Sequence, residues 1–148
     1  MEIMKIKGSL NKGFTGGITY ITLIPDDFEE LNVTLSFGMR EVKVIDKTLV
    51  EDIQTSWQAN YPEPADDETI KEIIARQKGE INFSLFINDQ FIGAAHRDDT
   101  NKIVKITKTD ASLGFQPYHG RRGIIKIILN VISVVNDNTP YELKVEVA

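Results

Sequence analysis

A short polar loop in the second half of the chain carries the side chains best suited to binding an anion. Tyr118 and His119 are followed, after one glycine, by Arg121 and Arg122. Guanidinium groups match the geometry of carboxylates and phosphates, and a tyrosine ring offers a face for stacking. One interpretation of this segment is therefore a pocket for an anion or a sugar phosphate. The alternative is a solvated loop whose arginines pair with acidic residues on the surface.

A second cluster stands at the end of a predicted strand and combines a base, a cation and two carboxylates. Its residues are His96, Arg97, Asp98 and Asp99, and Asn101 follows closely. The oxygens of Asp98, Asp99 and Asn101 are ligands that Ca²⁺ accepts from a tight loop. The same residue types also form ordinary turns, and the longer acidic ladder of an EF-hand is missing. We expect a turn here, and no bound metal or other cofactor.

The two clusters form one site only if the loops that carry them lie at the same end of the molecule. A joint site would place His96 and His119 in one pocket with the arginines, which would suit a small hydrolase or a protein that binds carbohydrates or anions. Sequence motifs of the common nucleophilic and nucleotide-binding sites, such as G-x-S-x-G, H-E-x-x-H, the P-loop and G-x-G-x-x-G, are absent. The chain has no cysteine, which excludes a disulfide, a thiolate zinc site and a cysteine nucleophile.

Trp57 is the single tryptophan and lies on a predicted helix, on the side that also carries Val50 and Ile53. A large aromatic side chain in such a position most often packs against a sheet. The other interpretation is that Trp57 caps a carbohydrate groove, as exposed aromatic residues do in lectin-like sandwiches. Trp57 therefore joins the candidate ligand-binding residues.

Most of the chain has the two-residue period of β-strands, and these strands must position the candidate loops. Eight segments alternate apolar and polar residues between turns rich in glycine, proline, asparagine or aspartate. They are residues 4–10, 18–25, 31–39, 81–87, 90–96, 102–108, 124–135 and 141–148. Segment 18–25 is apolar on both faces, which predicts a strand in the centre of a sheet. The pattern predicts a mainly β fold, an antiparallel and jelly-roll-like β-sandwich.

Residues from about 46 to 78 interrupt the strands with a helical period. Leu49 and Trp57 belong to an apolar stripe, and Thr48 with Glu51 fits a capping box at the start of the first helix. Two prolines end this helix near residue 60, and a second amphipathic helix follows from about residue 67 to 78. We predict a single domain over residues 1–148 with a two-helix insertion.

The overall composition restricts the partners and the location of the protein. With 148 residues, of which 41% are hydrophobic and 26% charged, the chain has the size and composition of one globular domain. Its net charge of −5 argues against general binding to nucleic acid, which needs a concentrated basic surface. No apolar run approaches the ~20 residues of a membrane span, and the first residues lack the apolar core of a signal peptide. We expect a cytoplasmic protein that binds neither nucleic acid nor membrane.

Six stretches of the sequence stand in an order that is similar to that of a known accessory module. They read, in chain order, ITLIPDDFEELNVTLSF, INFSLFIND, GAAHRDD, TKTDASLGFQP, GIIKIILNVISVV and YELKVEV. TDASLGFQP is the most specific of them, although Ser112-Leu113 replaces the Thr-Pro of the usual pattern. Together they cover most of the chain outside residues 46–78. They resemble the N-terminal β-sandwich of bacterial metal-dependent phosphoesterases of the PHP type, in the branch related to carbaryl hydrolases.

This resemblance implies a stand-alone copy of the accessory β-sandwich without the catalytic domain. In the long proteins the catalytic domain follows the module, and its metal cluster requires many His, Asp and Glu residues, whereas this chain has two histidines. No catalytic residue can be carried over, so we expect a non-catalytic binding or protein-interaction module that acts as a homodimer or with another protein. The alternatives are the hydrolase or carbohydrate- or anion-binding protein described above, and a Ca²⁺-dependent lectin-like binder.

Overall fold

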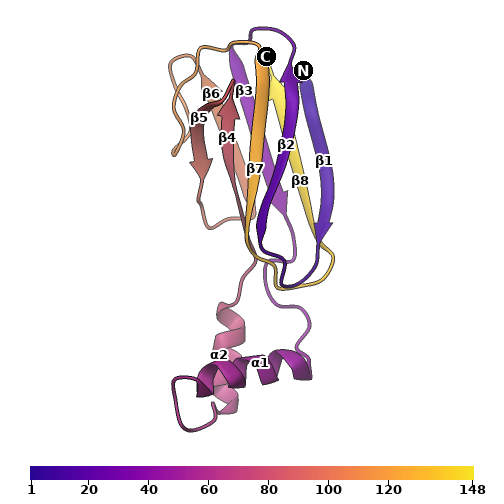
Figure 1. The fold of residues 1–148 in the computed structure, drawn as a ribbon, viewed down its shortest axis with the longest axis vertical. Coiled ribbons are helices and arrows are strands. Elements are labelled where there is room, and N and C mark those ends of the chain that lie inside the picture. The colour runs from indigo at the N-terminus through magenta and orange to yellow at the C-terminus, as the bar shows by residue number, and fades with distance from the viewer.

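The computed structural model describes residues 1–148 and shows eight antiparallel strands in two sheets, with a pair of helices at one end (Figure 1). The strands are β1 (Glu2–Leu10), β2 (Gly16–Ile24), β3 (Glu30–Phe37), β4 (Glu80–Ile87), β5 (Gln90–Ala95), β6 (Asn101–Thr107), β7 (Gly123–Ser133) and β8 (Thr139–Val147). One sheet has the order β1-β8-β3-β6 and the other β2-β7-β4-β5, so successive strands change sheet except at the β4–β5 hairpin. The predicted antiparallel β-sandwich is confirmed, and its finer assignment as a jelly roll stays a prediction.

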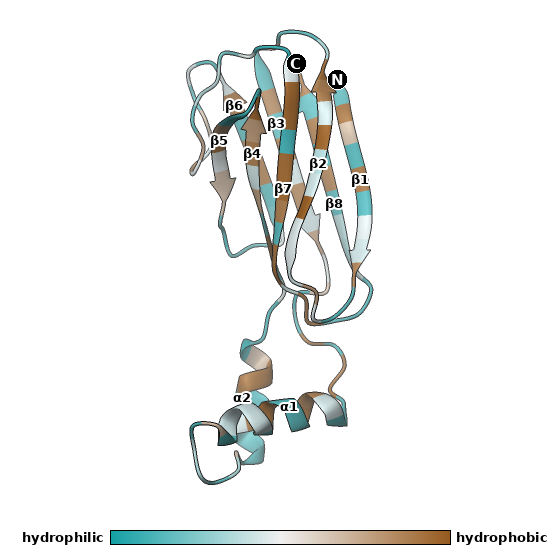
Figure 2. Ribbon diagram, in the orientation of Figure 1, coloured by the Kyte–Doolittle hydropathy of each residue, from teal (hydrophilic) through white to brown (hydrophobic).

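Alternating residues of the two sheets meet in one core of 25 buried side chains. On β3, for example, Leu31, Val33 and Leu35 are fully buried and the residues between them are not. Burying one such side chain stabilises the fold by about 1.5–3 kcal/mol relative to leaving it in water. Hydrophobic residues are accordingly spread along the strands of both sheets (Figure 2).

The position of β2 differs from the prediction, because this strand lies at the edge of its sheet and pairs only with β7. Ile18 and Tyr20 pack on the core, but Ile21 and Leu23 point outward and are exposed. Apolar residues on both faces of a strand therefore do not establish that another strand lies on each side of it.

The insertion forms a helical lobe (residues 46–77) with helices α1 (Lys47–Gln58) and α2 (Asp67–Arg76). Asp46 caps α1, since its Oδ1 accepts the Leu49 N–H at 2.8 Å, so the capping box expected at Thr48 and Glu51 is wrong. The lobe has its own small core, separate from that of the sandwich: Leu49, Ile53, Ala65, Ile70 and Ile74. Neither helix is long and apolar enough to cross a membrane.

The lobe joins the sandwich through a narrow neck in which the outgoing and returning chains pair. The Gly79 N–H donates to the Arg40 carbonyl at 2.7 Å, next to an antiparallel bridge between Glu41 and Lys78. Buried Asn136 fixes the outgoing chain, because its Nδ2 donates to the carbonyls of residues 39 and 41 and its Oδ1 accepts the N–H of residue 43, each at 2.7 Å. The neck therefore holds the lobe at the sandwich end where β3 finishes and β4 begins.

Candidate functional site

The two loops that would have to meet in a joint site lie at opposite ends of the sandwich. The loop after β5 meets the end of β3, where the Phe37 N–H donates to the Thr100 carbonyl at 3.0 Å. The loop after β6 meets the start of β3, where the Phe28 N–H donates to the Gly120 carbonyl at 2.7 Å. Strand β6 separates them, and its seven residues span roughly 20 Å. A pocket that joins His96 to His119 is therefore excluded.

The carboxylates proposed as Ca²⁺ ligands are already paired with cations. Asp98 forms an ion pair with Arg40, and Asp99 lies 3.9 Å from Arg97 Nε and 3.4 Å from Lys102 Nζ. Lys102 has no exposed surface, so burial lowers the pKa of its ammonium group, and the negative charge of Asp99 opposes that shift. Its Nζ also donates to the Asp99 carbonyl at 2.5 Å. These aspartates stabilise a buried lysine and the neck, whereas His96 is exposed.

The Tyr118–Arg122 loop contacts Asp27 through hydrogen bonding and charge, and Phe28 through packing. Asp27 accepts the backbone N–H of Arg122 at 2.8 Å and lies 3.9 Å from Arg121 Nη1. Tyr118 stacks on Phe28 with ring centroids 6.3 Å apart, so that one face of its ring is covered. An anion near the arginines would have to compete with Asp27. The alternative prediction, in which the arginines pair with surface acids, holds for Arg121, whereas Arg122 bonds Asp27 through its backbone only.

His119 lines a hollow of about 370 Å³ at the same end of the sandwich. The hollow mixes both signs of charge, because Lys108 and Arg121 line it together with Asp27 and Glu29. Such a balance favours no class of charged ligand. The loop residues therefore cap this end of the sandwich with charges of both signs.

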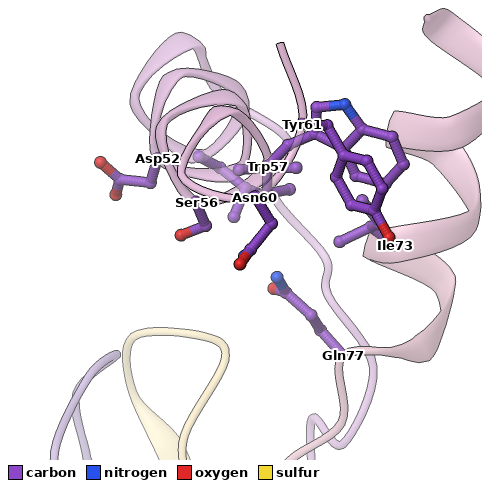
Figure 3. A pocket seen from close by; sticks show the side chains of 9 residues that line it. Asp52, Ser56, Trp57, Asn60, Tyr61, Ile73 and Gln77 are labelled. Carbon is purple, nitrogen blue, oxygen red and sulfur yellow. The ribbon is translucent and has the colours of Figure 1, made fainter. Parts of the chain in front are cut away.

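Trp57 lies instead in a pocket of about 440 Å³ that is built by the helical lobe. We call it the Trp57 pocket, and it is lined by Leu49, Asp52, Ile53, Ser56, Trp57, Asn60, Tyr61, Ile73 and Gln77. Trp57 and Tyr61 stack with centroids 4.3 Å apart and an interplanar angle of 23°, and Ile73 of α2 lies beside them (Figure 3). Trp57 thus packs on its own lobe and not on a sheet.

The polar side of the Trp57 pocket comes from α1, from the turn directly after it and from the residue that ends α2. Asp52, Ser56 and Asn60 follow one another at intervals of four residues and so lie on one side of the helix. Gln77, directly after α2, reaches toward Asn60 from below (Figure 3). A ligand in this pocket therefore meets flat apolar groups on one side and hydrogen-bonding groups on the other.

A turn between the helices fixes the aromatic pair. Gln54 binds both backbone groups of Ala65, accepting its N–H at 2.9 Å and donating to its carbonyl at 2.8 Å. The Trp57 Nε1–H donates to the Glu63 carbonyl at 3.0 Å, which orients the indole ring. Asp66 then caps α2 by accepting the Thr69 N–H at 2.8 Å, and that hydrogen bond lowers the pKa of Asp66. The pocket walls are therefore set by hydrogen bonds within the lobe.

A comparison with protein families decides where the chain belongs. The sequence model of a family of unknown function, DUF6669, matches residues 1–148. The chain belongs to the DUF6669 family. No curated protein matches its sequence. The resemblance to the PHP-type accessory module stays a prediction, because the description of DUF6669 names no phosphoesterase.

Among the residues that line the pocket of this DUF6669 member, Trp57 is the one that the sequence predicted as a binding residue. The signal was present in the stripe of Asp52, Ser56 and Asn60, which is polar at helical spacing beside an aromatic pair four residues apart. Gln77 continues the stripe of Ile73 and Ile74 on the second helix, and the packing of that stripe on α1 brings it to the pocket. The candidate site therefore combines the predicted residue Trp57 with lining residues that the sequence analysis did not propose.

Proposed function

We propose that the protein is a non-catalytic binding module whose recognition site is the Trp57 pocket. The observation that carries this proposal is the half-exposed Trp57–Tyr61 stack, which borders four polar side chains in one concave surface. Large aromatic groups next to a few convergent polar groups are typical of small-molecule and peptide sites. The sandwich serves as the rigid support that presents the lobe.

The charge of the pocket restricts its ligand. Asp52 is the one charged residue in the lining, so the pocket carries a negative charge and no compensating cation. Neutral or cationic ligands are therefore favoured over anions. A suitable ligand has a flat or apolar part that covers the aromatic pair, with hydroxyl or amino groups that reach Asp52, Asn60 and Gln77. Neutral sugars and quaternary or primary amines fit this description.

The unique tryptophan allows a direct test, because all indole fluorescence comes from the pocket. The protein is titrated with neutral di- and trisaccharides and with tetramethylammonium while the emission of Trp57 is followed. We expect a saturable change with at least one of these probes, and at least a tenfold weaker affinity in Tyr61→Ala. Phe91→Ala is the matched control, because Phe91 is an equally exposed aromatic residue on the sandwich.

The proposal fails if none of these probes changes the emission, or if the ligand found binds Tyr61→Ala as well as it binds the parent protein. An accessory, non-enzymatic role agrees with the resemblance to the PHP-type module, and that resemblance is itself a proposal. The cytoplasm remains the proposed location, on the sequence argument alone.

A further inference from the structure

The four outer strands of the two sheets differ in how their open sides are protected. An edge strand exposes unpaired backbone N–H and C=O groups, and natural proteins usually cover such an edge or place charges, prolines or bulges on it. The edge strands here are β1 and β6 of one sheet and β2 and β5 of the other.

Strands β5 and β6 are covered by the long loop that follows β6. On β5, the Ala94 N–H donates to the Gly114 carbonyl at 3.1 Å, and the Gln116 N–H donates to the carbonyl of residue 92 at 2.9 Å. On β6, the Ser112 N–H donates to the Lys105 carbonyl at 2.9 Å, and residue 107 bonds residue 110. Strand β1 has no cover, but it carries Glu2 and two lysines and has a register shift near its start.

Strand β2 has none of these protections. Its nine residues, GGITYITLI, include no charged residue and no proline, and its register with β7 runs without a shift from Gly16 to Ile24. No hydrogen bond joins its open side to another part of the chain. The bare edge is therefore long, regular and uncharged.

The outward face next to this edge is mostly apolar, with one cation, Lys126 of β7, which pairs with Ile21 and lies over the Phe86 ring. Ile21 and Leu23 of β2 are 62% and 64% exposed, and Ile124 of β7, which pairs with Leu23, is 54% exposed. The outward face of the other sheet is instead laced with ion pairs: Lys7–Glu142, Lys105–Glu30 and Lys144–Glu146. An antiparallel sheet normally keeps its outward face polar, so the β2 side is the exception in this molecule.

We infer that β2 pairs antiparallel with β2 of a second copy of this chain and joins two four-stranded sheets into one. Two copies related by a two-fold axis present the same edge to each other, so each open N–H finds a C=O of the same strand. The register that pairs all nine residues is centred on Tyr20. It sets Ile21 beside Thr19 of the other copy and Leu23 beside Gly17, whose missing side chain leaves room for the leucine.

The charges around the strand do not oppose this arrangement. Strand β2 carries no charged residue, so no like charges face each other along the paired strands. Each end of β2 carries both signs of charge: the Lys12 backbone N–H donates to Asp137 at one end, and Asp26 lies beside Arg121 and Arg122 at the other. A foreign strand would gain the backbone bonds but nothing in β2 selects its sequence, so the second copy is the better occupant.

Sedimentation velocity of the full chain over a concentration series tests the inference. We expect a dimer that dissociates on dilution, and a loss of at least tenfold in dimer affinity in Ile21→Lys, which would place two like charges on the shared edge. Ile103→Lys is the matched control, because Ile103 is 56% exposed on the outward face of β6 in the other sheet. Ile103→Lys should leave the dimer intact. Leu23→Lys provides a second edge variant, and circular dichroism confirms that each variant is folded.

Two further measurements separate this contact from other contacts. Amide hydrogen exchange should show protection of residues 16–24 that rises with protein concentration. Phe91→Lys, on the far strand β5 of the same face, should leave an edge-paired dimer intact but would disrupt two sheets stacked face to face. A parent protein that stays monomeric at high concentration overturns the inference. So does a dimer that survives both Ile21→Lys and Leu23→Lys, or one that Phe91→Lys dissociates.

Discussion

Replacing Asn136 gives the sharpest test of how the neck holds the lobe. Its side chain is buried and makes three hydrogen bonds of 2.7 Å to the backbone of residues 39–43. A typical hydrogen bond contributes about 0.5–1.5 kcal/mol net, so Asn136→Ala should cost about 2–4 kcal/mol. A protein of this size loses roughly 2–4 °C of melting temperature per kcal/mol. We therefore expect a fall of roughly 5–15 °C in the thermal transition followed by circular dichroism.

An isosteric variant separates hydrogen bonding from packing. Asn136→Asp keeps the shape and the acceptor for the Lys43 N–H, but it turns a carboxylate oxygen toward the carbonyls of residues 39 and 41. If the hydrogen bonds matter, Asn136→Asp is less stable than Asn136→Ala, because two lone pairs then face a buried negative charge. If filling the space is what matters, the order is reversed, and that order would refute the reasoning. Asn101→Ala, at an exposed asparagine without a side-chain hydrogen bond, should change stability by less than about 0.5 kcal/mol.

Three more predictions concern other parts of the fold. Gly120→Ala should cost more than about 2 kcal/mol in urea unfolding, because φ is +62° and the new Cβ would meet the Phe28 carbonyl oxygen. Burial, followed by the 2.5 Å hydrogen bond with Tyr20, raises the pKa of Tyr141 to about 12. The stability that depends on neutral Tyr141 is complete below pH 10.0 and is lost as the pH rises toward about 12, so stability should fall over that range in the parent and less in Tyr141→Phe. Trp57 fluorescence should report unfolding of the lobe at a lower urea concentration than circular dichroism reports for the sandwich, because the two cores are separate.

Each of these predictions has an internal check. Gly13→Ala has a similar positive φ of +86° but no atom within 4 Å, so a cost equal to that of Gly120→Ala would contradict the clash argument. An equal loss of stability at high pH in the parent and in Tyr141→Phe would exclude Tyr141 as its source. Coincident unfolding curves from fluorescence and circular dichroism would show that lobe and sandwich unfold as one unit.

The strands could be predicted because each buries alternate residues in one core. Leu31, Val33 and Leu35 repeat at two-residue spacing, and only an extended strand places such residues on a single face. The place of a strand within its sheet is a different matter. Ile21 and Leu23 make the second face of β2 apolar, which predicted a central strand. In the structure β2 is an edge strand, and Ile21 and Leu23 are exposed. Neighbour relations depend on tertiary pairing that local sequence does not encode.

The separation of the two candidate loops was within reach of the sequence. The loop at His96 precedes the predicted strand 102–108, and the loop at His119 follows it. A single strand crosses the sandwich from one end to the other, so loops on its two sides fall at opposite ends. The start of α1 was harder to place, because Asp46 and Thr48 are both good capping residues and only the structure shows which one accepts the Leu49 N–H.

The paired neck has a consequence for how the protein can change. Since the chain leaves and rejoins the sandwich at two hydrogen-bonded residues, Arg40 and Gly79, the whole lobe occupies the place of one surface loop. The free-energy cost of closing a loop, which is entropic, rises by only about 0.6 kcal/mol for each doubling of its length. A lobe of another sequence, or a plain hairpin, can therefore be grafted between residues 43 and 78, which keeps the hydrogen bonds of Asn136, with little effect on the strands. Under the proposed function, binding specificity would therefore be an exchangeable part, while the sandwich stays the same.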